Sequence, residues 1–223
     1  MAKALVIGGG AFGTSMANVL ANEFDEVLVQ VRSQDVLEGI KNGENAIYLP
    51  GKKLNKKLSP FINWNEIKDK INSIELIVLG LPTGAIHHYF SQKENLSNLK
   101  LILANDKSMV SLCKGIDSDT LELPDDLLND YLIDYRDQIT FLSGPSFASE
   151  IMDEQITLAS LAGRSKKHLD KVAKYLSCHY FKVFMTYDIK GVLLGGALKN
   201  IYAIASGIVF GKKYGENAVA SII

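Results

Sequence analysis

The sequence predicts an α/β fold in which a doubly wound, mostly parallel sheet carries helices on both faces. The first helix or helices of an all-α second domain are expected to follow it. Three observations predict this fold. Short, continuously apolar segments alternate with helical patterns through most of the chain. A glycine-rich turn joins the first such segment to the first helical pattern. From about Asp188 the strand pattern ends and a long apolar helix begins.

The first element is an apolar strand at residues 4–7, and a G-x-G-x-x-G motif follows it at Gly8, Gly10 and Gly13. Gly8 permits a tight turn, and Gly10 lets the backbone approach a pyrophosphate. Gly13 allows the next helix to pack closely on the strand, so that the helix N-terminus faces the phosphates. This combination is typical of a dinucleotide-binding Rossmann unit. A glycine turn in another α/β domain is the alternative, and the later segments disfavour it.

Further strands are expected at residues 26–31, 75–81, 108–113, 138–142, 157–162 and 182–185, with a helix at residues 166–177. The segment 41–65 is rich in Asn, Gly, Lys and Pro and is expected to form a long loop, of a kind that is usually functional or mobile. We expect two domains. Residues 1–187 form the dinucleotide-binding Rossmann domain, and residues 188–223 begin an α-helical substrate domain.

The composition is that of an ordinary globular protein, with 223 residues, 47% hydrophobic residues and a net charge of −1. This balance gives no electrostatic reason to expect nucleic acid or an anionic membrane as a partner. Cys113 and Cys178 fit neither a metal-ligand spacing nor a disulfide framework, which is typical of a reducing cytosol. No leader pattern precedes the first strand, so a cytoplasmic location is expected.

The segment 191–210 is nearly uncharged and long enough to be tested as a membrane span. Its single lysine, Lys199, would cost about 2.5–3.5 kcal/mol near a bilayer centre. A buried helix of a soluble domain, without membrane insertion, is therefore the expectation. Gly195, Lys199, Ala203 and Gly207 recur every four residues, which places them on one face with space for a ligand or a neighbouring backbone.

The end of the second predicted strand bears on the choice of cofactor. NAD-binding Rossmann units commonly place an acidic residue there, on the ribose 2′-hydroxyl. Here Arg32 occupies the strand end and no acid is present. An arginine suits a 2′-phosphate, so NADP is expected to be accepted, with NAD as the other candidate. An ordinary solvent-exposed arginine is the alternative interpretation.

Three other strand ends carry polar or glycine motifs that should converge on one crevice. Pro82 ends the strand at 75–81, Lys114 follows the next strand, and Ser143-Gly-Pro-Ser-Phe-Ala148 follows the strand at 138–142. The exposed N–H groups of the last motif predict a second anion or polar-ligand site. Simple helix capping by serine and an ordinary surface lysine are the alternatives.

Lys199 is the residue that we expect to carry catalysis, with Asn200 beside it. A lysine within an apolar, small-residue helix is expected to be desolvated, which suits proton transfer. A lysine whose stem packs while its amine reaches water is the alternative. His87 and His88 have no metal partner at ligand spacing, and His168 and His179 have the pattern of surface or helix-end residues.

Together these motifs resemble the bacterial-type NAD(P)-dependent glycerol-3-phosphate dehydrogenase family. The matching segments are Val6–Thr14 (VIGGGAFGT), Asn45–Gly51 (NAIYLPG), Leu81–Thr83 (LPT), Cys113–Ile116 (CKGI), Leu142–Ala148 (LSGPSFA), Gly196–Ile201 (GALKNI) and 207–220. The resemblance implies reversible reduction of dihydroxyacetone phosphate to glycerol 3-phosphate, which feeds phospholipid synthesis.

The resemblance also implies roles for single residues. Lys199 matches the general acid/base, and Lys114 matches a residue that touches substrate and cofactor. The matching substrate contacts are Gly144, Ser146, Lys199 and Asn200. The matching cofactor contacts are Gly8, Gly10, Ala11, Phe12, Gly13, Arg32, Tyr48, Pro82, Lys114 and Ala148. Ala11 departs from the pattern, because many members carry Ser or Thr there, so one hydrogen bond to phosphate is expected to be missing.

A second departure is the end of the sequence at Ile223, where the family continues for roughly another hundred residues. We therefore expect a truncated chain that binds cofactor but is inactive by itself, and whose exposed apolar face favours a homodimer. Two other functions compete with this interpretation. One is a related β-hydroxyacid or sugar-acid dehydrogenase, which the YLPG and LSGPSF motifs disfavour. The other is a non-catalytic dinucleotide-binding module, which the presence of Lys199 disfavours.

Overall fold

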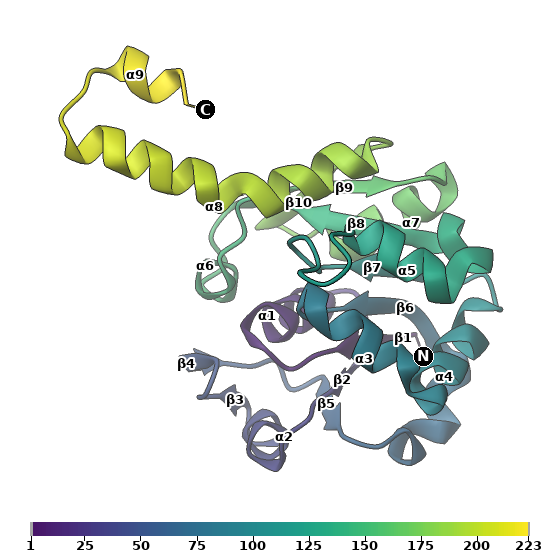
Figure 1. Ribbon diagram of the computed structural model, residues 1–223. Coiled ribbons are helices and arrows are strands. Elements are labelled where there is room, and N and C mark those ends of the chain that lie inside the picture. Colours follow the sequence, from purple (N-terminus) through teal and green to yellow (C-terminus); the bar gives the residue numbers. More distant parts are fainter. Residues whose placement is uncertain (1, 223) are drawn as a thin grey trace.

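The computed structural model describes residues 2–222 (Figure 1). Its strands are β1 (Lys3–Ile7), β2 (Glu26–Gln30), β3 (Glu44–Asn45), β4 (Leu49–Lys53), β5 (Leu58–Phe61), β6 (Ile74–Leu79), β7 (Ser108–Ser111), β8 (Ile139–Ser143), β9 (Thr157–Gly163) and β10 (Phe181–Thr186). Its α-helices are α1 (Ala11–Leu20), α2 (Gln34–Lys41), α3 (Ile86–Ser91), α4 (Lys93–Leu103), α5 (Pro124–Leu132), α6 (Ala148–Met152), α7 (Lys166–Leu176), α8 (Ile189–Gly211) and α9 (Glu216–Ala220). Short 3-10 helices lie at Trp64–Ser73, Thr83–Ala85 and Ile133–Gln138.

Eight of the strands form one sheet in the order β10-β9-β8-β7-β6-β1-β2-β5. Neighbouring strands run parallel except β8 and β9, which are antiparallel. The predicted mostly parallel, doubly wound sheet is therefore confirmed. The order of strands reverses between β1 and β6, and parallel α/β sheets bind ligands at the carboxyl ends of strands where such a reversal occurs.

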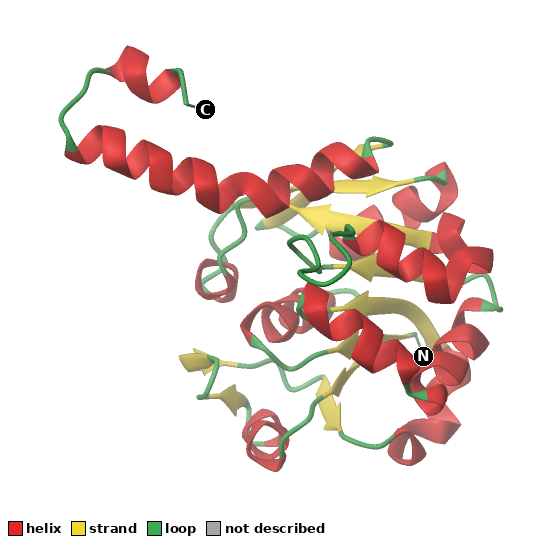
Figure 2. Cartoon of the chain, in the orientation of Figure 1, coloured by secondary structure: helices red, strands yellow, loops and turns green. Residues whose placement is uncertain are grey.

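Helices cover both faces of the sheet (Figure 2). One face packs under α1 and α7 through a core that includes Val6, Met16 and Val172. The opposite face packs under α3, α4 and α5 through a core that includes Phe90 and Leu127. Burial of two apolar faces explains why the central strands are continuously apolar and do not alternate with polar residues.

The expected loop at residues 41–65 is wrong in part. Strands β3 and β4 form a small antiparallel hairpin there, and β5 pairs in parallel with β2 at the edge of the main sheet. Pro60 stands within β5 opposite Val29. A proline has no N–H to donate to a neighbouring strand, so it is tolerated at a sheet edge, where one side of the backbone has no partner strand. The proline and the polar residues around it hid these strands from the sequence pattern.

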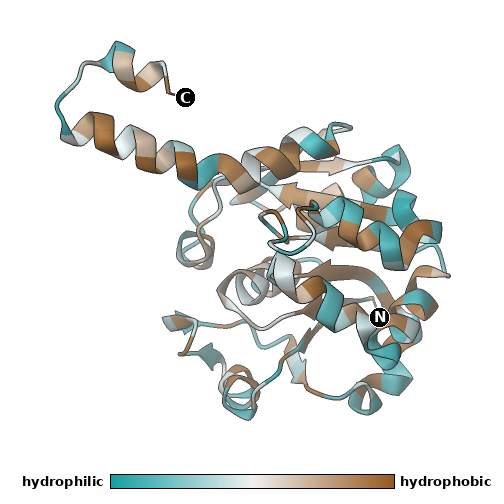
Figure 3. Cartoon of the chain, viewed as in Figure 1, coloured by the Kyte–Doolittle hydropathy of each residue, from teal (hydrophilic) through white to brown (hydrophobic). Residues whose placement is uncertain are grey.

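Helix α8 extends beyond the sheet, and its apolar bands are largely uncovered (Figures 1 and 3). Of its residues, Ile189 and Leu193 are buried against the core. Its outer turns have no packing partner among residues 2–222, which agrees with the exposed apolar face that the sequence predicts for this chain. By length and composition alone α8 is the single described helix that could span a membrane.

The glycines of α8 have different surroundings. Gly195 and Gly207 face open space, whereas Gly196 makes the close approach to the sheet. A Cβ atom on Gly196 would lie 2.5 Å from the Ser143 hydroxyl oxygen at the end of β8. Gly196 therefore permits the N-terminal half of α8 to cross directly over the carboxyl edge of the sheet.

Candidate functional site

A cavity of about 970 Å³ opens at the carboxyl edge of the sheet, around the point where the strand order reverses. Residues that line it and were predicted to bind a cofactor are Gly8, Gly10, Phe12, Arg32, Tyr48, Pro82 and Lys114. Ala11, Gly13 and Ala148 are not among its lining residues in the described chain. Gly13 is buried beneath the turn, and Ala148 begins α6, which packs against α1.

The glycines in the turn between β1 and α1 have different structural roles. Gly8 has a φ of +109°, which side chains disfavour, and a Cβ there would lie 2.4 Å from the Gly80 carbonyl oxygen. A Cβ on Gly13 would lie 2.0 Å from the Gly8 carbonyl oxygen. Both glycines are therefore required for packing of the turn.

Gly10 differs from these two glycines, because a Cβ there would meet no atom within 4 Å. It faces the cavity and stands at the N-cap of α1 without a capping side chain. The first N–H groups of α1 are thus left for a ligand, and the space over Gly10 is where a pyrophosphate would approach the backbone. This cradle fits a dinucleotide.

The opposite wall of the cavity lies at the end of β2. Arg32 is exposed there and lines the cavity, and Ser33 caps α2 by accepting a hydrogen bond from the Val36 N–H at 3.3 Å. The Tyr89 hydroxyl donates to Gln30 Oε1 at 2.6 Å, and burial raises the pKa of Tyr89, which keeps it a donor. Gln30 and Tyr89 were missed from the sequence, since no motif marks a pair formed between β2 and α3.

The β3–β4 hairpin carries Tyr48 to the rim of the cavity. Asn45 holds the hairpin in place, because its Nδ2 donates to the Gly9 carbonyl at 3.0 Å and to Thr14 Oγ1 at 2.9 Å. Lys52 on the same hairpin forms an ion pair with Asp153 after α6. Asn45 belongs to the NAIYLPG motif, and this contact is a physical reason for an asparagine there.

Lys114 lies between the glycine turn and the motif after β8. Its Nζ is 3.2 Å from Ser146 Oγ and 4.7 Å from the centre of the Phe12 ring. Burial, and after it the positive charge of Lys199, together lower the pKa of Lys114 to about 8. Its backbone is fixed as well, since Thr83 Oγ1 donates to the Lys114 carbonyl at 2.8 Å.

The motif after β8 forms a tight turn. Gly144 has a φ of +151°, and a Cβ there would lie 3.0 Å from the Ala159 Cα on β9. Ser146 Oγ donates to the Gly144 carbonyl at 3.2 Å, which holds the serine toward Lys114. The turn thus brings Ser146 and Lys114 together, as the convergence of strand ends predicts.

Lys199 stands nearer to solvent than the sequence predicts. It is exposed, as is the neighbouring Asn200, and its Nζ lies 5.8 Å from the centre of the exposed Phe147 ring. The expected desolvation is therefore wrong within residues 2–222, because this turn of α8 has no covering layer there. Lys199 nevertheless lies on the Lys114 side of the sheet, close enough for its charge to act on Lys114.

His168 also departs from expectation, because it is buried rather than at the surface. Its Nδ1 is 2.9 Å from Ser108 Oγ at the start of β7, and burial lowers the pKa of the imidazole. This pair lies at the opposite end of the strands from the cavity and belongs to the core.

Comparisons with known proteins identify the family of this chain. The N-terminal part of the NAD-dependent glycerol-3-phosphate dehydrogenase family matches residues 3–169, and the C-terminal part matches residues 188–223. Glycerol-3-phosphate dehydrogenase (NAD(P)+) of Solidesulfovibrio magneticus is 35% identical over 99% of this chain, and that of Staphylococcus haemolyticus is 33% identical over all of it. The chain spans 64% and 65% of the lengths of these two relatives.

Solved structures show the same likeness. The crystal structure of glycerol-3-phosphate dehydrogenase from Coxiella burnetii has a TM-score of 0.78 and 27% identity, over 99% of this chain and 65% of that one. The enzyme of Saccharomyces cerevisiae has a TM-score of 0.77 and 25% identity, over 99% and 66%. With its glycine cradle, its Lys114–Ser146 pair and a family match over most of its length, the chain belongs to the NAD-dependent glycerol-3-phosphate dehydrogenase family.

Proposed function

We propose that the protein catalyses the reversible reduction of dihydroxyacetone phosphate to sn-glycerol 3-phosphate with NAD(P)H, and so supplies glycerophospholipid synthesis. The observation that carries this proposal is the position of Lys114, which lines the dinucleotide-sized cavity and contacts Ser146 at 3.2 Å. A cation at the junction of a cofactor cradle and a polar turn suits an anionic, carbonyl-bearing substrate. The names of the relatives support the same reaction.

The chain offers a set of groups to hold the dinucleotide. The open N-terminus of α1 and the bare backbone at Gly10 suit the pyrophosphate, and Phe12, Tyr48 and Pro82 supply apolar walls. Arg32 is proposed to contact the 2′-phosphate of NADP, with NAD also accepted. Gly8 and Gly13 act by permitting the turn, and Ala11 and Ala148 act through the backbone. When bound, the dinucleotide supplies or accepts the hydride.

The substrate is proposed to lie over the Ser143–Ala148 turn. Lys114, Ser146 and the Gly144 backbone would orient its polar groups, with Asn200 as a further contact from α8. Lys199 is proposed as the general acid, which gives a proton to the carbonyl oxygen as hydride reaches the carbon and takes it back in the reverse reaction. The effect of Lys199 on the Lys114 charge supports a shared site.

Three further proposals concern the domain division, the location and the assembly of the protein. We place the division between the Rossmann and helical domains at 187/188, which the family match from residue 188 supports. A cytoplasmic protein without membrane insertion is proposed, because α8 is better explained as part of a helical domain. For this chain of 223 residues, a homodimer is proposed from its exposed large apolar side chains, with Ile201 at 63% and Phe210 at 79%.

The direct test is a substrate comparison with the full-length protein. NADPH absorbance is followed after addition of dihydroxyacetone phosphate, and in parallel after addition of a β-keto acid as the matched alternative substrate. The proposal predicts rapid oxidation with the phosphorylated ketone and none above background with the acid. Oxidation with the acid alone, or saturable NADPH binding without any turnover, would replace it with one of the competing functions.

A further inference from the structure

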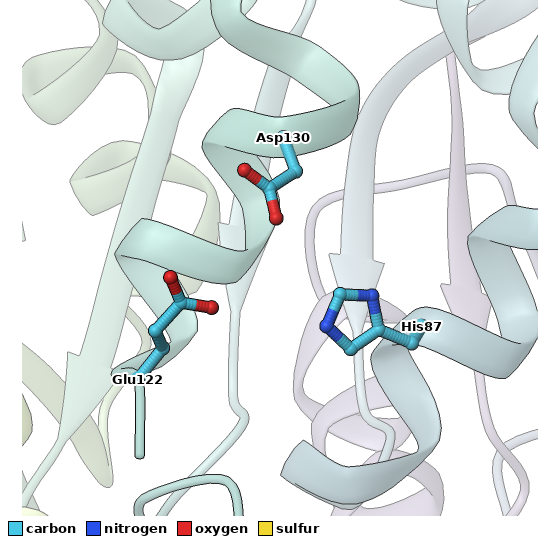
Figure 4. A group of neighbouring side chains, drawn as sticks. All are labelled: His87, Glu122 and Asp130. Atoms are coloured by element: carbon cyan, nitrogen blue, oxygen red, sulfur yellow. The ribbon is translucent and has the colours of Figure 1, made fainter. Parts of the chain in front are cut away.

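Three potential metal ligands from separate segments meet at one place outside the cofactor cavity. His87 lies on α3, Glu122 lies two residues before the start of α5, and Asp130 lies on α5. One nitrogen or oxygen atom of each lies within 4.8 Å of the others. Figure 4 shows the imidazole edge and both carboxyl groups directed into the space between the two helices. The sequence spacing concealed this group, because only packing of α3 against α5 brings it together.

The imidazole of His87 is held in the orientation that a metal ligand needs. Its Nδ1 is 2.7 Å from the Tyr131 hydroxyl, and the two rings meet edge to face. Its Nε2 is buried, yet has no hydrogen-bond partner among the described residues. Figure 4 shows that this nitrogen points toward Glu122 and Asp130. Metal-bound histidines characteristically give their second nitrogen to such an outer partner.

We propose that His87, Glu122 and Asp130 form a site for a divalent transition-metal ion of the zinc class, with Tyr131 as the positioning residue. With the proton on Nδ1 and shared with the tyrosine oxygen, Nε2 presents a lone pair. One imidazole nitrogen and two carboxylate oxygens match the ligand types of zinc, and water completes the shell.

The three ligand atoms must move closer together to bind one ion. Ligand atoms around tetrahedral zinc stand roughly 3.3 Å apart, which follows from bonds of about 2.0–2.1 Å. The carboxylates can supply this movement, because Glu122 is half-buried and Asp130 is exposed. A buried nitrogen without a hydrogen-bond partner costs free energy, and a bond from Nε2 to the ion would offset that cost.

Such an ion would connect the cavity wall to the segment that carries Lys114. The other side of α3 lines the cavity through His88 and Tyr89. The segment between β7 and α5 is tied to Glu122 by the Asp117 N–H, which donates to the Glu122 carbonyl at 2.9 Å. The ion would therefore clamp α3 to the loop after Lys114, and this proposal does not depend on the identity of the substrate.

The test is calorimetric titration of the chelator-treated protein with Zn²⁺, together with thermal unfolding with and without the ion. We expect one saturable site per chain and a raised Tm, because an ion that binds the folded state stabilises it. Glu122→Gln and Asp130→Asn should each weaken Zn²⁺ binding by roughly ten-fold or more, and His87→Gln should do the same. Tyr131→Phe should weaken it roughly ten-fold through the outer contact.

The matched control is His179→Gln, which removes a histidine that lies 3.1 Å from Glu154 at the surface. It should leave the Zn²⁺ affinity unchanged. The Tm of each variant, measured without metal, shows whether the variant folds. Glu122 and Asp130 lie near the surface, so their variants should keep the wild-type Tm in the absence of metal. The proposal is overturned if Zn²⁺ does not bind saturably, or if folded Glu122→Gln and Asp130→Asn proteins bind it as the wild type does.

Discussion

The ammonium group of Lys114 lies 3.2 Å from the hydroxyl oxygen of Ser146, which joins the end of β7 to the turn after β8. Thr83 Oγ1 donates to the Lys114 carbonyl, and Ser146 Oγ donates to the Gly144 carbonyl. The pair thus forms a polar corner beside the glycine cradle.

The first prediction concerns the charge of this corner. Because burial and then Lys199 lower the pKa of Lys114 to about 8, its ammonium form is present below that pH and is lost above it. The kcat/KM for dihydroxyacetone phosphate in the full-length protein should therefore fall as the pH rises through about 8. Lys114→Arg keeps its charge over this pH range, so in that variant kcat/KM should no longer fall near pH 8. If kcat/KM of the arginine variant falls over the same pH range as in the wild type, Lys114 is not the cause.

The second prediction separates two glycines of one motif. Gly13→Ala should cost about 1–3 kcal/mol or more of unfolding free energy, because its Cβ would lie 2.0 Å from the Gly8 carbonyl oxygen. Gly10→Ala meets no atom within 4 Å and should leave stability nearly unchanged. It should nevertheless weaken NADPH binding by roughly ten-fold or more, since the methyl group occupies the pyrophosphate approach. Urea denaturation and fluorescence titration measure the two effects, and full NADPH affinity in Gly10→Ala would refute the cradle.

The third prediction concerns Arg32. Arg32→Ala should weaken NADPH binding more than NADH binding, by about 1–3 kcal/mol for a charge-assisted phosphate contact. Titration with each cofactor measures the difference, and Lys68→Ala provides a control for an exposed cation that does not line the cavity. Equal losses for both cofactors would show that Arg32 does not contact the 2′-phosphate.

The fourth prediction concerns His168 and the stability of the core. Burial holds its folded-state pKa below the ordinary value of 6.5. As pH falls through 6.5, the unfolded chain binds a proton that the folded state resists, so the unfolding free energy should decrease until the folded pKa is passed. Urea denaturation between about pH 7.5 and pH 5.5 measures this loss. His168→Gln should reduce this pH dependence of the unfolding free energy, whereas the exposed His88→Gln should not. If the His168→Gln protein keeps the wild-type pH dependence, another group is responsible for it.

The sequence predicted those parts of the fold that depend on local pattern. Continuous apolar strands and the glycines of the first turn are visible because their neighbours in sequence are also their neighbours in space. The edge strand β5 was missed because Ser59 and Pro60 are typical of loops. Its pairing with β2 depends on tertiary contacts that the local sequence does not show. The burial of His168 was missed because a single histidine in an amphipathic helix carries no sign of the Ser108 partner on β7.

The candidate site follows the same division. The strand-end motifs predicted that Lys114 and Ser146 converge, because parallel strands bring their carboxyl ends to one edge. The pairing of Gln30 with Tyr89 and the group around His87 could not be predicted, since each joins segments far apart in the chain. The surroundings of Lys199 depend on what packs on α8, which its own helical pattern does not encode.

The central claim is that Lys199 performs proton transfer at the corner formed by Lys114 and Ser146. The decisive measurement is the turnover of dihydroxyacetone phosphate by full-length Lys199→Ala protein, with NADPH binding measured in parallel. We expect kcat to fall by roughly 10²–10⁴-fold or more while NADPH affinity stays nearly unchanged, because Lys199 does not line the cavity. A Lys199→Ala protein that keeps wild-type turnover would contradict it.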